Sequence, residues 1–307
     1  MKIKNFLFHR VSPEKDLMWP PVHPGEFEKI IGFLVKNYHV VLLENFLEAS
    51  VLKSINKPVA TVLFDDGYKD NFEFAAPILK KYNCPASFYI VTECINEGIP
   101  TWTYIVDFFF KEYPKNSLEL EYDFIPANLR ISKWYSSGQA EELAVRLKTC
   151  LKSLPNEQRL GVMEEIKRKL KGIAFPRDLM MNWENVRQLN IAGFYIGSHT
   201  HSHPMLASII NEDEIENELR QSACIINEQL GYRPTTISYP IGSWDERVVR
   251  IAKNVGYKLG LVVEQRQYDS EQDDKLLIPR IELYNESWWK TKLRMNGIYQ
   301  SIKRLVR

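Results

Sequence analysis

Short apolar runs alternate with amphipathic segments along most of the chain. The run at residues 59–64 is continuously apolar, as in a strand that is buried on both faces of a sheet. The segment 26–35 instead places its apolar residues at helical spacing. This alternation predicts βα units and a largely parallel sheet, so the fold class is α/β. The predicted strands are 6–8, 40–43, 59–64, 86–91, 194–196, 236–239, 257–263 and 277–283, and the predicted helices are 26–35, 71–82 and 211–230.

Residues from about 100 to 178 break this alternation. They are helical in pattern, charged and aromatic, and they contain no good strand candidate after Phe124. We interpret them as a helical insertion into the α/β frame rather than as an independent domain. The prediction is therefore one domain over residues 1–287, followed by a basic tail over 288–307.

Charge and composition narrow the function classes. The 307 residues carry 40 lysines and arginines against 39 aspartates and glutamates, so no global positive field would attract nucleic acid. The apolar run at the N-terminus is interrupted by His9 and Arg10, which makes it too short for a secretory signal, and no stretch approaches the ~20 apolar residues of a membrane span. The four cysteines contain no CxxC pair. We therefore expect a cytoplasmic protein without a nucleic-acid partner; its oligomeric state is not determined by these patterns.

The C-terminal tail is basic and begins with two tryptophans, Trp288 and Trp289. A basic helix flanked by aromatic residues can lie on an anionic membrane surface, here the inner face of the membrane. The alternative is an ordinary solvated helix that packs its tryptophans on the core. The tail contains no acidic residue, and its basic residues are Lys290, Lys292, Arg294, Lys303, Arg304 and Arg307.

Two adjacent carboxylates, Asp65 and Asp66, follow the apolar run at 59–64. Ligands bind at this end of the strands in parallel α/β folds. Neighbouring carboxylates repel each other unless a cation or a shared proton relieves the repulsion. A metal ion could bind one of them and leave the other free to act as a base. An Asp-Gly turn without chemistry is the alternative for this segment.

Three of the six histidines lie within five residues, at His199, His201 and His203. Histidines together with a carboxylate are the ligands of catalytic zinc sites that keep one position open for water. An extended backbone would place all three on one face, whereas a tight turn would favour His199 with His203. Periodicity leaves this choice open.

A third segment, Ser238 to Gly242, ends the predicted strand at 236–239. Proline and glycine at a strand end can hold backbone N–H groups open toward a ligand. Trp244 follows closely and is the tryptophan that we expect first to stack on a sugar ring, although most tryptophans simply pack in the core.

Together the three segments resemble the motifs of the polysaccharide deacetylase family (NodB-homology domain, carbohydrate esterase family 4), in the same order, over residues 1 to about 285. The resemblance implies a distorted (β/α) barrel, a divalent metal that is usually zinc, and an N-acetylated sugar substrate. By position it implies Asp66, His199 and His203 as metal ligands. It implies Asp65 as the general base and the backbone N–H of Ile241 as a donor to the oxyanion, with His201 at an unconstrained position.

Two departures from the family pattern concern the catalytic acid and the base. Ser238 stands where the third motif often begins with an arginine, and no histidine follows His203, so the late Leu-x-His motif is missing. The leaving amine needs another proton source, for which we prefer His9; a structural role for His9 is the alternative. Arg280 does not deprotonate and is a poor acid, but it could supply positive charge to the substrate. We also expect Tyr239 to contribute to substrate binding.

The expected function is metal-dependent hydrolysis of an N-acyl group, here N-acetyl, from an amino sugar. A cytoplasmic substrate would be a lipid-linked or nucleotide-linked precursor of a surface polysaccharide. One alternative is a weak or inactive carbohydrate-binding scaffold with the same fold. The other is a metal-dependent hydrolase of a non-sugar amide or an ester.

Overall fold

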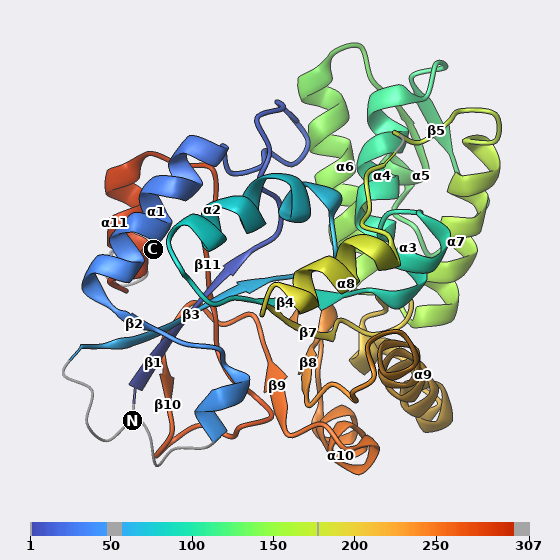
Figure 1. Cartoon of the computed structure of the whole chain (residues 1–307). Helices are drawn as coiled ribbons and strands as arrows, with labels where there is room; N and C mark the ends of the chain where they lie inside the picture. The colour runs from blue at the N-terminus through green and yellow to red at the C-terminus, as the bar shows by residue number, and fades with distance from the viewer. Residues whose placement is uncertain (1, 48–56, 177, 298–307) are drawn as a thin grey trace.

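A curled, mostly parallel sheet forms the centre of the molecule (Figure 1). The computed structural model describes residues 2–47, 57–176 and 178–297. Neighbouring strands run in the order β10-β1-β3-β4-β7-β8-β9, with β2 beside β3, and only β10 is antiparallel to its neighbour. The strands are β1 (Lys2–Phe8), β2 (His39–Val40), β3 (Val59–Phe64), β4 (Ser87–Ile90), β7 (Tyr195–Ser198), β8 (Thr236–Ser238), β9 (Leu259–Leu261), β10 (Tyr268–Asp269) and β11 (Ile281–Glu282).

The stretch from Ile278 to Glu282 joins the two ends of this sheet. The backbone N–H of Ile278 donates to the carbonyl of Gly260 in β9 at 2.7 Å. Three residues later β11 pairs in parallel with β1, with Ile281 opposite Phe6. The sheet therefore curls back on itself, which confirms the expected distorted (β/α) barrel.

Helices cover the outside of the barrel (Figure 1). The predicted helix at 211–230 is confirmed as α9, whose first turn is capped by the Asn211 side chain and whose last turn ends at Gly231 in the left-handed conformation (φ 78°). The predicted helix at 71–82 begins with a π-helical turn at Asn71–Ala75 before it continues as α2. The covering helices are α1 (Pro24–Asn37), α2 (Ala76–Lys81), α3 (Thr92–Glu97), α8 (Trp183–Ile191), α9 (Glu212–Leu230) and α10 (Glu246–Val255).

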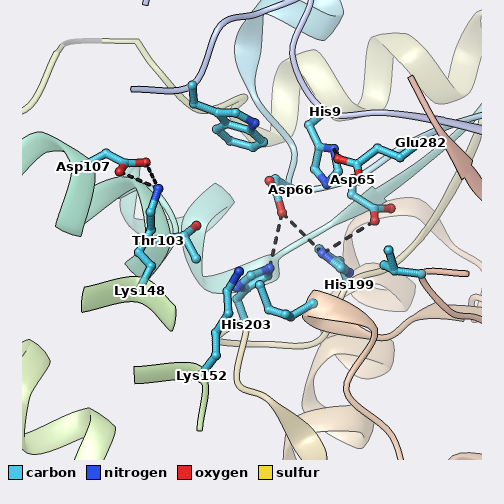
Figure 2. Close-up of a pocket in the computed structure, with 13 residues that line it drawn as sticks. His9, Asp65, Asp66, Thr103, Asp107, Lys148, Lys152, His199, His203 and Glu282 are labelled. Carbon is cyan, nitrogen blue, oxygen red and sulfur yellow. Dashed lines mark hydrogen bonds and ion pairs between the residues drawn. The ribbon is translucent and has the colours of Figure 1, made fainter. Parts of the chain in front are cut away.

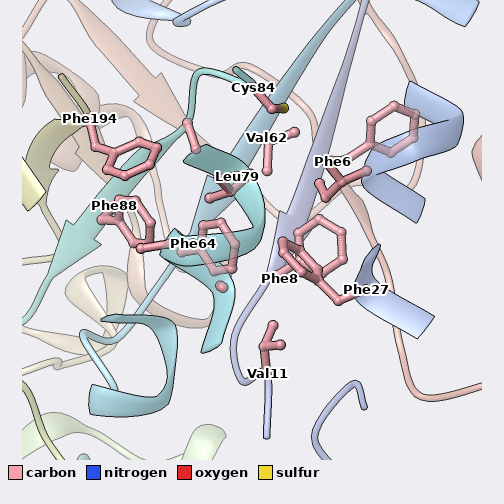
Figure 3. Close-up of a cluster of buried hydrophobic side chains, with 14 of the residues drawn as sticks. Phe6, Phe8, Val11, Phe27, Val62, Phe64, Leu79, Cys84, Phe88 and Phe194 are labelled. Atoms are coloured by element: carbon pink, nitrogen blue, oxygen red, sulfur yellow. The ribbon is translucent and has the colours of Figure 1, made fainter. Parts of the chain in front are cut away.

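Phenylalanine rings fill the space between the sheet and the helices α1 and α2 (Figure 3). Phe64 stacks on Phe88 of the next strand, with ring centroids 4.6 Å apart, and Phe8 packs edge-on against Phe27 of α1 at 5.0 Å. Because Phe8 and Phe64 are the last residues of β1 and β3, this packing fixes the strand ends from which the site residues project.

The insertion is mostly helical, as predicted, and packs its own hydrophobic cluster around Phe109, Phe110 and Trp134. The expectation of no strand after Phe124 is wrong, because β6 (Ile131–Lys133) pairs antiparallel with β5 (Ser117–Glu119). Only the central Leu118 of β5 is buried, so the hairpin carries little of the apolar signal of a core strand. The insertion helices are α4 (Trp102–Glu112), α5 (Ala127–Arg130), α6 (Ser137–Lys152) and α7 (Asn156–Lys169).

The tail begins with the helix α11 (Trp288–Met295), and Lys303, Arg304 and Arg307 lie outside the described residues. Trp288 packs edge-on against Phe33 of α1 at 5.6 Å, whereas Trp289 is 60% exposed. Within the described parts of the chain, no helix has the length and apolar character needed to cross a membrane.

Candidate active site

The end of β3 directs two consecutive carboxylates to different partners. Asp65 is held by its backbone N–H, which donates to the carbonyl of Phe8 at 3.1 Å. Asp66 then adopts a left-handed conformation (φ 75°), and Gly67 does the same (φ 87°). A Cβ atom at position 67 would lie only 3.0 Å from the Ile95 side chain, and a residue with a side chain would be strained at this positive φ. The turn therefore requires glycine. The turn places both carboxylates in the interior of one site.

The loop after β7 is coiled tightly enough to separate its three histidines. Thr200 and His203 have positive φ values of 66° and 61°, and the Thr200 hydroxyl accepts the backbone N–H of His203 at 3.1 Å. The Glu218 carboxylate of α9 accepts the backbone N–H groups of His201 and Ser202. His201 is thereby turned away, and its Nδ1 lies 2.9 Å from the hydroxyl of Thr92. This is the tight-turn alternative, in which His199 and His203 converge.

Asp66, His199 and His203 form a compact, buried group of metal-ligand type (Figure 2). The Asp66 Oδ1 atom lies 3.3 Å from His199 Nε2 and 3.4 Å from His203 Nε2, and all three ligand atoms lie within 4.8 Å of one another. His199 Nδ1 lies 2.7 Å from the carbonyl of Ser238, which fixes the ring so that Nε2 faces the group. Two imidazoles and one carboxylate suit a divalent transition metal with open positions.

The ionisation states of Asp66 and His203 agree with that assignment, whereas the pKa of His199 is raised because Asp65 and Asp66 outweigh the effect of burial, so a metal would displace a proton there. Burial alone would raise the pKa of Asp66, but hydrogen bonds with His199 and His203 outweigh it and hold the pKa well below its usual value. Burial lowers the pKa of His203, which favours the neutral imidazole that a metal requires. The three residues therefore fit the metal site that the family resemblance implies.

Asp65 is held by Arg280, which reaches it from the segment that closes the barrel. Arg280 Nη1 donates to both Asp65 oxygens at 2.9 and 2.8 Å, and the Ser238 hydroxyl donates to Oδ2 at 3.0 Å. Burial would raise the pKa of Asp65, but the charges of Arg280 and His199 lower it below its usual value. The arginine missing at position 238 is thus replaced in space by one that comes 42 positions later in the chain.

This placement corrects the expectation that Arg280 touches the substrate. Its side chain is enclosed, with 1% of the residue exposed, and its Nε donates to the carbonyl of Val262. The Arg280 guanidinium pairs with the Asp65 carboxylate and does not line the pocket.

Ile241 and His9 both line the pocket that contains the metal-ligand group. Ile241 has φ 60° and ψ 5°, a left-handed conformation that is rare for a β-branched residue and costs of order 1–3 kcal/mol. Strained backbone conformations of this kind are concentrated at active sites and ligand-binding sites. His9 follows β1, and its Nδ1 lies 3.3 Å from the Glu282 carboxylate of β11, while its ring packs at 5.3 Å from Trp19.

The pocket has a volume of about 330 Å³ and lies between the barrel and the insertion. One wall consists of the barrel residues described above. The other comes from the insertion: Thr103 and Asp107 of α4, and Lys148 and Lys152 of α6 (Figure 2). Lys148 forms an ion pair with Asp107 at 2.5 Å. This wall was not predicted from the sequence, although the spacing of four residues within each pair would place its members on one helix face.

Tyr239 and Trp244 lie apart from this pocket. Tyr239 is fully buried in the hydrophobic cluster beneath α9 and α10, so the expected contact with substrate is wrong for this enclosed side chain. Trp244 lines a second pocket together with Arg250 and Lys253 of α10. The structure therefore does not bring Trp244 together with the metal-ligand group.

Comparisons with known proteins identify relatives of this chain. A family model described as polysaccharide deacetylase matches residues 53–138 and 155–260. The chain is 21% identical over 267 residues to YxkH of Bacillus subtilis, a protein named after this family, with 86% of this chain and 65% of YxkH covered. It is 35% identical over 74 residues to a peptidoglycan-N-acetylglucosamine deacetylase of Bacillus cereus, which covers 24% of this chain and 26% of that protein. The chain thus spans less than two thirds of either curated relative.

Among solved structures, the chain is similar to the deacetylase PplD of Streptococcus pyogenes in complex with acetate. The TM-score is 0.62 at 18% identity, and the alignment covers 96% of this chain and 98% of PplD. At this identity the likeness concerns the fold, and it agrees with the barrel described above.

Proposed function

The chain belongs to the polysaccharide deacetylase family, and from that premise we propose that it hydrolyses the N-acetyl group of an amino sugar with the help of a bound divalent metal. The observation that carries the proposal is one pocket that combines a buried Asp66-His199-His203 group with a second, ionised carboxylate at Asp65. Zinc suits this donor set. Deacetylase names among the relatives, and the acetate bound to PplD, support N-acetyl as the acyl group.

The residues around the metal-ligand group have distinct parts in this reaction. A metal held by the three ligands would polarise the amide carbonyl and lower the pKa of a water molecule. Asp65 accepts the proton of the attacking water, and Arg280 keeps Asp65 ionised and oriented for this task. The strained backbone at Ile241 presents an N–H group toward the oxyanion. His9, oriented by Glu282, donates a proton to the nitrogen as the C–N bond breaks, so that acetate and a free amine leave.

We further propose that the substrate is a lipid-linked or nucleotide-linked precursor of a surface polysaccharide, processed in the cytoplasm at the inner face of the membrane. The exposed Trp289, next to Lys290 on α11, is the surface feature that supports membrane contact. Its neighbour Lys292 has a structural role in addition, because its ammonium lies 5.0 Å from the Trp288 ring.

Acetate release tests this function. The purified protein is incubated with nucleotide-linked and lipid-linked N-acetylglucosamine, with and without a chelator. Chelator-sensitive acetate release is the expected result. A scaffold protein would release none, and a hydrolase of non-sugar amides or esters would act on acetanilide or a p-nitrophenyl ester but not on the sugars. The Asp65→Asn variant should bind the metal and release no acetate, whereas binding by a scaffold would be unaffected.

A further inference from the structure

The insertion wall of the pocket carries a lysine, Lys152, that forms no ion pair within the described part of the chain. Among the described residues, no carboxylate oxygen lies within ion-pair distance of Lys152, the last residue of α6. Its neighbour Lys148 is different, because Asp107 neutralises it at 2.5 Å. Figure 2 shows the Lys152 side chain reaching from α6 toward the side of the pocket where His203 lies.

The other charges that line the pocket are already matched. Asp65 is paired with Arg280, Asp66 faces two imidazoles, and Glu282 faces His9. Lys152 is thus the charged group of the described pocket lining that has no ion pair. Burial and the neighbouring Lys148 lower the pKa of Lys152, and the more distant carboxylates of Glu282 and Asp107 offset this only in part, so a bound anion would stabilise the charged form.

Most of the helix that supplies this lysine lies outside the segments that match the family model. The family model matches residues 53–138 and 155–260, so residues 139–154, which include both lysines of the wall, lie outside the matched segments. Chemistry shared by the family is carried by the barrel wall. A feature of α6 is therefore suited to distinguish one substrate from another.

We propose that Lys152 binds the phosphate of a phosphate-linked amino sugar whose acetamido group lies at the Asp66-His199-His203 group. The proposal rests on the proposed function. A pocket of about 330 Å³ is at the small end of ligand sites, which suits one sugar ring and its phosphate rather than a buried oligosaccharide. Thr103 lines the same wall, and its hydroxyl, which lies 2.9 Å from the Thr101 hydroxyl, can accept from Thr101 and donate to a phosphate oxygen.

Calorimetric titration with N-acetylglucosamine 1-phosphate and with neutral methyl N-acetylglucosaminide tests the subsite. Each sugar is titrated into zinc-loaded and into chelator-treated protein, because phosphate could also contact the metal. We expect the phosphate sugar to bind about tenfold more tightly in both forms, as one charge-assisted contact provides. Lys152→Ala should reduce this preference to less than about twofold, and Lys152→Arg should retain most of it.

Lys171→Ala is the matched control, since Lys171 is an exposed lysine of the insertion outside the pocket, and it should behave as wild type. Equal binding of the two sugars by the wild type, or a preference that survives Lys152→Ala, would overturn the proposal. Circular dichroism confirms that the variants keep their helices.

Turnover separates this proposal from the proposed function. If no sugar releases acetate but the binding preference depends on Lys152, the deacetylase function fails and the phosphate subsite stands. If acetate is released from neutral and phosphate-linked sugars at rates that Lys152→Ala does not change, the subsite fails and the function stands. Uridine diphosphate N-acetylglucosamine and a short-chain prenyl diphosphate N-acetylglucosamine then distinguish a nucleotide from a lipid as the source of the phosphate; both should lose about tenfold in kcat/KM in Lys152→Ala.

Discussion

Arg280 should stabilise the protein mainly through Asp65, and a double-mutant cycle measures this coupling. The guanidinium is enclosed and donates to both oxygens of the buried carboxylate at 2.9 and 2.8 Å. Arg280→Met leaves Asp65 charged and buried, with the Ser238 hydroxyl and His199 at 3.9 Å as its remaining side-chain partners among the described residues. Removal of one partner from a buried pair costs about 3–5 kcal/mol.

Asp65→Asn should destabilise the protein for the same reason, because it leaves the Arg280 charge unpaired in the core. The double variant removes both charges and should recover much of the loss. We therefore expect a coupling free energy of at least about 2 kcal/mol between Asp65 and Arg280. The assay is urea unfolding followed by tryptophan fluorescence at pH 7, in chelator so that metal binding does not contribute.

The surface pair Arg250–Glu212 provides the control, since both side chains are about half exposed. Arg250→Met should cost less than about 1 kcal/mol. Additive losses at positions 65 and 280, or a loss in Arg280→Met no larger than that in Arg250→Met, would show that Asp65 and Arg280 do not stabilise each other. Since Arg280 does not line the pocket, Arg280→Met should also lower kcat while KM stays close to the wild-type value.

Three further predictions follow from the pocket. His9→Ala should keep its zinc content but lose most of its acetate release, and near-normal turnover would contradict the role of His9 as the acid. Glu218→Ala should lower zinc affinity about 10–100-fold in competition with a chromogenic chelator, because the carboxylate holds the histidine loop; an unchanged affinity would contradict this. Burial raises the pKa of Asp107 to about 6 even though Lys148 lowers it, so folding favours the protonated form. The contribution of Asp107 to wild-type stability should therefore fall by up to about 3 kcal/mol as the pH rises from about 4 to about 6, so the stability difference between the wild type and Asp107→Asn in thermal denaturation should change by that amount; parallel curves would contradict it.

The parts of the fold that follow from local pattern could be predicted from the sequence. The strand at 59–64 is confirmed residue for residue, because a run buried on both faces is apolar throughout. The strand predicted at 277–283 is reduced to a bridge at Ile278 and the pair Ile281–Glu282. Pro279 lacks the N–H group of a continuous ladder, and its carbonyl instead accepts the side chain of Asn5.

The residues of the site that lie in recognisable sequence motifs could be predicted, but their arrangement in space could not. The two histidines that converge could not be chosen from spacing, because the positive φ values at Thr200 and His203 break the alternation of an extended chain. Asp65 and Arg280 are 215 positions apart in the sequence, and a local sequence pattern cannot predict a contact between residues so widely separated. The lysines of α6 were missed for the same reason, since they face the pocket only once the insertion packs on the barrel.

The decisive measurement on this pocket is whether acetate release depends on the bound metal. Protein stripped with a chelator should release no acetate from N-acetylglucosamine linked to a diphosphate, and stoichiometric zinc should restore the reaction. His203→Ala, which removes one of the three ligands, should bind zinc weakly and stay inactive after the same addition. Full acetate release by the stripped protein, or full restoration in His203→Ala, would contradict the account.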